Sequence, residues 1–137
     1  MSKTFAVWIL SGCIVSLAPV GAVYAHHAAA AEYDVEKAVE FKGVLTKVEW
    51  VNPHVHMDFD IKGADGQTST YTVEFISVGG LRRAGITNKK VLVIGETYTV
   101  VVNPARDGRH AGLSNTMTFP DGHVYRLIAQ TPEGPSY

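Results

Sequence analysis

Histidine is the residue type in this sequence with the clearest capacity for chemistry. Neutral imidazole is a common metal ligand, and its charge changes near neutral pH. Two pairs lie close together in the chain, His26 with His27 and His54 with His56. The other two, His110 and His123, lie in turn-like contexts and are expected to face solvent. The spacing of the two pairs points to metal binding.

His54 and His56 lie within the alternating segment "HVHMDFDI". Residues two apart on a strand project to the same face, about 7 Å apart along the backbone. Both imidazoles could therefore approach one ion, and Asp58 and Asp60 share their face. The alternative is that this face is simply polar and solvated.

The role of His26 and His27 depends on the leader that precedes them. Lys3 is followed by 21 uncharged residues, 5–25, which is the layout of a secretory signal peptide. Val23 and Ala25 fit the small-residue rule for cleavage after Ala25. Cleavage there would make His26 the first residue of the mature chain.

Two other readings of the leader remain open. Residues 10–13, "LSGC", match a bacterial lipoprotein box that would be cut before Cys13. The apolar run continues beyond Cys13, which favours the signal peptide. The leader could also stay uncut as a membrane anchor, since about 20 apolar residues can span a bilayer. Pro19 and the small residues after it argue against an anchor.

A mature chain that begins at His26 would carry a free amine beside two imidazoles. The amine has a pKa near 8, so a metal ion displaces its proton at modest cost. Such nitrogen-rich surroundings suit Cu(II), which also leads the divalent affinity order. The sequence thus predicts a copper site built from His26, His27 and His54, with His56 as an optional fourth ligand. The alternative is a mobile arm whose histidines have no fixed role.

Composition limits the other possibilities. Cleavage leaves 112 residues, enough for one small domain, with 11 basic against 13 acidic side chains. This balance gives no electrostatic footprint for nucleic acid. The single cysteine leaves with the leader, so neither a disulfide nor a thiolate is expected in the mature protein. We expect a protein of the periplasm or the medium with no membrane attachment after cleavage.

The rest of the chain predicts an all-β domain with a minor helical part. Short alternating strands, a helix after Ser77 and turns at Asp65-Gly66, Gly95-Glu96 and 120–122 fit a five- to six-stranded OB-like barrel. An immunoglobulin-like sandwich is the alternative. The predicted core consists of alternating apolar residues: Val44, Val48, Val55, Met57, Phe59, Val73, Phe75, Val100 and Val102.

These assignments divide the chain into four parts. Residues 1–25 form the signal peptide, 26–40 an N-terminal arm, 41–129 the barrel and 130–137 a disordered tail.

A rival function is a binding module for a small ligand or a partner protein, with no metal. Trp50 could stack a ligand in an OB-type groove, and Arg82 or Arg83 could bind an anion there. A copper redox enzyme is a third class, which would need a substrate cleft that the sequence does not indicate. No nucleophile with a base, phosphate loop or carboxylate pair stands out, so an enzyme is the less favoured reading.

Three stretches, "HHAAAAEYD", "GVLTKVEWVNPHVHMDFDIKGADG" and "LRRAGIT", resemble a family of small exported bacterial proteins that form a domain of unknown function. The resemblance covers roughly residues 25–127, and its most specific part is the corner Trp50-x-Asn52-Pro53-His54. The family usually has an aromatic or aliphatic residue at the position of His56, which makes His56 the weaker candidate ligand. The resemblance implies export and an OB-like barrel, and it implies no established activity.

Overall fold

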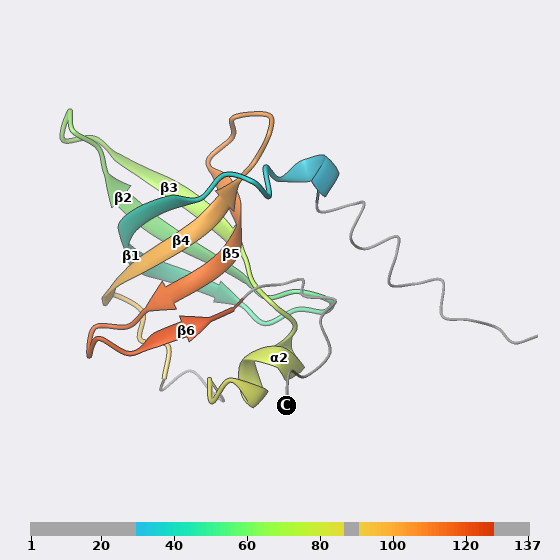
Figure 1. Ribbon diagram of the computed structural model, residues 1–137. Helices are drawn as coiled ribbons and strands as arrows, with labels where there is room; N and C mark the ends of the chain where they lie inside the picture. The colour runs from blue at the N-terminus through green and yellow to red at the C-terminus, as the bar shows by residue number, and fades with distance from the viewer. Residues whose placement is uncertain (1–29, 87–90, 128–137) are drawn as a thin grey trace, which may run out of the picture.

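The computed structural model describes residues 30–86 and 91–127. The predicted signal peptide, the histidines at 26 and 27, and the predicted tail lie outside these ranges. A helical turn at residues 30–32 precedes the named elements. Those elements are β1 (Val39–Glu49), β2 (His56–Lys62), β3 (Thr68–Glu74), α2 (Val78–Arg83), β4 (Thr97–Pro104), β5 (Ala111–Thr118) and β6 (Val124–Arg126), as Figure 1 shows.

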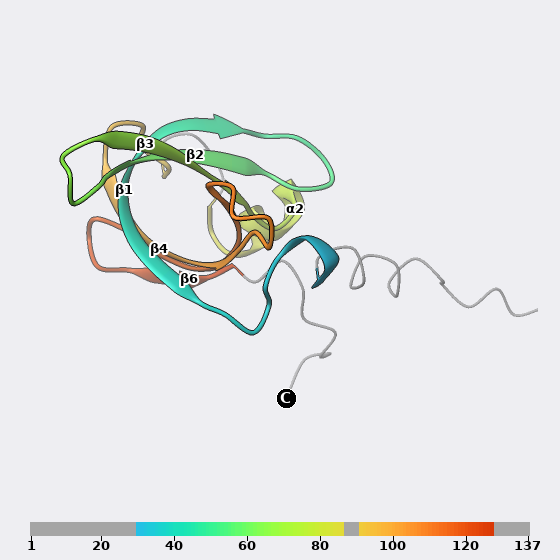
Figure 2. The same cartoon turned by 90° about the horizontal axis from the view of Figure 1, so that it is seen from above.

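The strands close into a barrel. Their order in the sheet is β3-β2-β1-β4-β5-β6, and a parallel pairing of β3 with β5 joins the ends of the first five. Figure 2 shows the resulting ring from above. β6 lies outside the ring, where it pairs only with β5. The predicted OB-like barrel is therefore confirmed, and the sandwich alternative is wrong.

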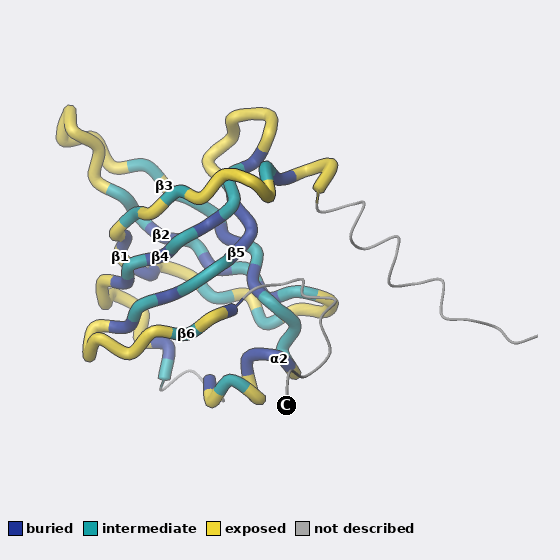
Figure 3. Tube along the Cα trace, in the orientation of Figure 1, coloured by how far each residue is buried: buried dark blue, intermediate teal, exposed yellow. Residues whose placement is uncertain are grey.

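The core fills the interior of this barrel. Met57 and Phe59 from β2 and Val100 and Val102 from β4 are completely buried. Figure 3 shows the buried positions alternating with more exposed ones along the strands, as expected for a closed sheet. Seven of the nine predicted core residues have no exposed surface: Val55, Met57, Phe59, Val73, Phe75, Val100 and Val102.

The first strand departs from the predicted alternation. Val44 is 37% exposed whereas Leu45 is completely buried, so the prediction of Val44 as a core residue is wrong. A β-bulge between Leu45 and Lys47 explains the difference. The extra residue switches which side of the strand faces inward. Val48, beyond the bulge, packs partly buried against the core as predicted.

The predicted helix after Ser77 is confirmed as α2. The Ser77 hydroxyl caps its first turn by accepting a hydrogen bond from Gly80 N at 3.1 Å. Gly85, with φ +90°, ends the helix, and Ile86 N donates to Leu81 O at 2.9 Å. Leu81 faces the core. The helix lies at one end of the barrel, on the opposite side from residues 30–32 (Figure 1).

No helix within the described ranges is both long and apolar enough to cross a bilayer.

Candidate functional site

Glu74, at the end of β3, links two distant parts of the chain through its two carboxylate oxygens. Tyr33 donates its hydroxyl hydrogen bond to Glu74 Oε2 at 2.9 Å. Nδ1 of His54 contacts Oε1 of the same carboxylate. The side chains of His54 and Glu74 are 31% and 19% exposed, so this contact lies in a partly sheltered place. The carboxylate thus holds the arm on one side and the β1–β2 connection on the other.

The pairing of β2 with β3 explains why His54, His56 and Glu74 gather. His56 is the register partner of Glu74. Backbone bonds continue the ladder past the strand ends, since Phe75 N donates to Val55 O at 2.7 Å and Val55 N to Ile76 O at 3.3 Å. Val55 is buried in the barrel, and its two neighbours therefore project outward. Glu74 then lies opposite one histidine and diagonal to the other.

The described part of the arm, residues 30–38, is fastened to the barrel beside this carboxylate. Tyr33 is 5% exposed and packs with Ala105 and Leu113 in a small second cluster. Asp34 N donates to Pro104 O at 2.8 Å, and Arg106 N donates to Glu32 O at 2.9 Å. Figures 1 and 2 show the helical turn of the arm beside the connection between β4 and β5.

A second contact secures the arm. The Arg109 guanidinium, from the β4–β5 connection, forms an ion pair with Glu32. We call the five side chains of these two sets of contacts, which the neighbouring residues Glu32 and Tyr33 bring side by side in the chain, the Glu74 cluster: Glu32, Tyr33, His54, Glu74 and Arg109.

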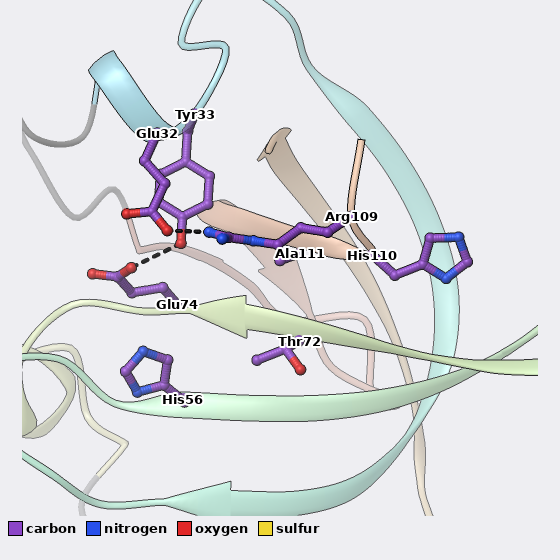
Figure 4. A pocket seen from close by; sticks show the side chains of 8 residues that line it. All are labelled: Glu32, Tyr33, His56, Thr72, Glu74, Arg109, His110 and Ala111. Atoms are coloured by element: carbon purple, nitrogen blue, oxygen red, sulfur yellow. Dashed lines mark hydrogen bonds and ion pairs between the residues drawn. The ribbon is translucent and has the colours of Figure 1, made fainter. Parts of the chain in front are cut away.

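A cavity of about 360 Å³ opens beside the Glu74 cluster. Figure 4 shows the side chains from the arm, β2, β3 and the β4–β5 connection that surround it. All but one of the residues that line it have a polar or charged side chain: Glu32, Tyr33, His56, Thr72, Glu74, Arg109, His110 and Ala111. In an OB-type barrel, the outer face of strands 2 and 3 and the adjoining loops form the usual ligand-binding surface. The cavity therefore occupies the place where the fold favours binding.

Electrostatics keep the Tyr33 phenol neutral. Burial, followed by the negative charge of Glu74, raises the pKa of Tyr33 well above its ordinary value. The hydroxyl consequently remains a hydrogen-bond donor to the carboxylate throughout the neutral range. On the exposed side, hydrogen bonding to Glu32 raises the pKa of Arg109.

The histidines and aspartates that share this face of the chain have different surroundings. His54 joins the Glu74 cluster and His56 lines the cavity, so the structure brings both predicted strand histidines to one place. Asp58 and Asp60 share the face of β2 but are engaged elsewhere. Each accepts a 2.8 Å hydrogen bond, from the hydroxyls of Thr72 and Thr70 respectively.

Within residues 30–86 and 91–127, histidine, cysteine, aspartate and glutamate form no group of three arranged to hold a metal ion. The remaining predicted ligands, His26 and His27, precede these residues.

The rival groove residues lie apart from this site. Trp50 lines an apolar hollow of about 290 Å³ together with Val48 and residues 92–94. Arg82 and Arg83 lie exposed in the last turn of α2 and do not line that hollow. None of the described residues that line the hollow is charged.

Several cluster residues were not predicted from the sequence. Tyr33, Glu74 and Arg109 gave no signal as a set, because 41 residues separate the first two and 77 residues separate Glu32 from Arg109. His110 was expected to face solvent. It is exposed but lines the cavity, where its ring stacks on Tyr71 with centroids 6.0 Å apart. In Figure 4 the ring of His110 points away from Glu74. Only pairing across strands and loops brings these residues together.

Neither a curated protein nor a solved structure matches the chain. A family model described as "Family of unknown function (DUF6152)" matches residues 13–115. The match spans β1 to β4, most of β5 and the whole Glu74 cluster. By this match over most of its length, the chain belongs to the DUF6152 family of proteins of unknown function.

Proposed function

We propose that this is an exported copper-binding accessory or carrier protein of the periplasm or medium. Cu(II) is held by the amine and ring of His26, the ring of His27 and Nε2 of His54, with His56 as an optional fourth ligand. Signal cleavage after Ala25 is part of the proposal because it creates the amine.

The contact between His54 Nδ1 and Glu74 carries the proposal. A metal-bound histidine almost always gives its other ring nitrogen to a carboxylate or carbonyl, which fixes the ring and its tautomer. Glu74 does this for His54 and is itself held by Tyr33. Nε2 of His54 remains as the nitrogen for a metal. A merely solvated histidine would need no such support.

The docked arm supplies the second argument. His27 lies three residues before Ala30, where the docked part of the arm begins, a span of about 10 Å when fully extended. The hydroxyl of Tyr33 is bound to the same carboxylate that contacts His54. The docked arm therefore ties the chain shortly after His27 to the carboxylate that contacts His54.

The cavity beside the Glu74 cluster gives the rival function its best support. A volume of about 360 Å³ falls within the range of small-molecule sites, so a binding module without metal is the second candidate. The polar side chains of the lining favour a small polar ligand. Aromatic stacking on Trp50, which the sequence suggests, is not available here because Trp50 lines the other hollow. This candidate predicts that copper binds weakly and without regard to His54.

Copper titration of correctly processed protein tests the proposal. Cu(II) should bind more tightly than Zn(II), and electron paramagnetic resonance should show several nitrogen ligands. His54→Ala should weaken binding, whereas His123→Ala, a change at an exposed histidine between β5 and β6, should not. Saturation should stabilise the fold by about 2.7 kcal/mol at a hundredfold excess over Kd. Equal binding by parent, His54→Ala and His123→Ala would exclude the site.

Acid should release the metal. Protonated imidazole and protonated amine cannot coordinate, so affinity should fall below about pH 6. An intact mass that begins at Met1, or at a lipid-bearing Cys13, would remove the amine from the ligand set.

A further inference from the structure

The second half of β1 has an open edge. β4 pairs with β1 only up to Val44. Leu45 extends this contact, since its N–H donates to Glu96 O at 3.0 Å and its carbonyl accepts from Gly95 N at 2.8 Å. From residue 46 to 49, β1 is paired with β2 on one side, and no other strand of the described residues lies along its second side. Such an edge offers backbone groups to another strand.

Apolar surface accompanies this open edge. Val48 and Trp50 line the hollow of about 290 Å³ on the β1 side, and residues 92–94 line it on the other. Three large apolar side chains beside it are exposed, Val51 at 47%, Val93 at 45% and Ile94 at 61%. Together they account for half of the six exposed large hydrophobic residues in the described ranges. An apolar surface beside a free strand edge is typical of a protein interface.

We propose that a second copy of this chain covers this surface, with the two β1 edges paired antiparallel about a two-fold axis through Val48. A two-fold interface brings the same segment of each copy together, so the segment must be complementary to itself. The surface is independent of the proposed copper site.

The charged residues on either side of Val48 favour a second copy of the chain as the partner that covers this surface. Lys47 and Glu49 flank Val48 and project to the opposite face from it, where they form an ion pair of 2.6 Å within one copy. Antiparallel pairing centred on Val48 places Lys47 of each copy directly across from Glu49 of the other. Opposite charges facing each other across paired strands are stabilising. The segment thus has the charge complementarity that self-pairing requires.

The same register also covers the exposed apolar side chains. Residue 51 of one copy comes opposite residue 45 of the other. The edge of Leu45 is already held by Gly95 and Glu96. Val51 of one copy therefore packs against the turn of the other copy that contains Val93 and Ile94. The three apolar side chains become buried together.

Two single charge changes test this register. Lys47→Glu gives a segment with two acids, and Glu49→Lys gives one with two bases. Each variant alone should dimerise roughly tenfold more weakly than the parent, because two attractive pairs become repulsive. A mixture of the two variants should restore dimers, since every acid then faces a base. Sedimentation equilibrium of the processed chain, which begins at His26, in the presence of a chelator measures this without interference from metal.

Both side chains are about half exposed, 56% for Lys47 and 49% for Glu49, so the variants are expected to fold. Circular dichroism checks this for each one. Weakened single variants and a restored mixture support the dimer. A parent that stays monomeric at millimolar concentration overturns it. A dimer that is unchanged in the single variants, or a mixture no stronger than its components, overturns it as well.

Discussion

The barrel core and the Glu74 cluster are built in opposite ways. Core residues such as Phe59 and Val100 lie on strands of a closed sheet and are completely buried. The Glu74 cluster is polar and partly exposed, and it joins the arm, the β1–β2 connection, β3 and the β4–β5 connection. The core residues therefore stabilise the fold but offer no group that could bind a ligand. The cluster residues offer such groups and contribute less to the free energy of unfolding. Core substitutions should therefore cost several kcal/mol of stability, and substitutions in the cluster about 1 kcal/mol or less.

The sharpest separation is expected from Phe59→Ala. Phe59 is completely buried and contacts the rings of Phe41, Phe75 and Tyr98. Its truncation should lower the free energy of unfolding by about 3–5 kcal/mol. Urea denaturation measures the loss, with Val44→Ala as the exposed control. Copper affinity of the folded protein should not change. A loss below about 1 kcal/mol would contradict the burial of this face of β2.

Glu74→Gln should show the reverse pattern. The amide keeps the shape of the side chain but removes the charge that orients His54. Loss of a supporting carboxylate typically costs about 10- to 100-fold in metal affinity. Isothermal titration with Cu(II) measures this, and Glu96→Gln at an exposed turn is the matched control. Unchanged affinity would show that Glu74 serves only to fasten the arm.

Tyr33→Phe tests how firmly the arm is fastened. The substitution keeps the ring packed against Ala105 and Leu113 but removes the donor to Glu74. A hydrogen bond to a charged group contributes about 1.5–3 kcal/mol when buried and less when partly exposed, so a loss of about 1 kcal/mol is expected. Tyr125→Phe is the control. Faster amide hydrogen exchange in residues 30–36 should accompany the loss. Equal stability and exchange in both variants would mean that packing alone holds the arm.

The smallest effect should appear at alkaline pH. Burial and Glu74 raise the pKa of Tyr33, so the folded state keeps a proton that the unfolded chain loses above about pH 10. Its contribution to stability is therefore complete below pH 10 and declines as the pH rises further. Denaturation series between pH 9 and 11 should fall less steeply for Tyr33→Phe than for the parent. Identical slopes would contradict the raised pKa.

Much of the barrel could be predicted from the sequence because its signals are local. Alternation placed Val55, Met57 and Phe59 inside, and Ser77 marked the start of α2. Val44 was misplaced because a β-bulge leaves no mark in the pattern of apolar residues. His54 and His56 were found by their spacing. Their partner Glu74 was not predicted, because it is brought to them by the pairing of β2 with β3 and no spacing in the sequence indicates it.

The central claim is that the start of the mature chain and His54 bind one copper ion together. A double-mutant cycle tests it directly, using Cu(II) affinities of the processed protein, the same protein with one extra N-terminal residue, His54→Ala, and the combination. Each change alone should weaken binding sharply. The combination should cost clearly less than the two losses added together, because either change already breaks the shared site. Fully additive losses, or single changes without effect, would show that the N-terminal histidines and His54 do not share an ion.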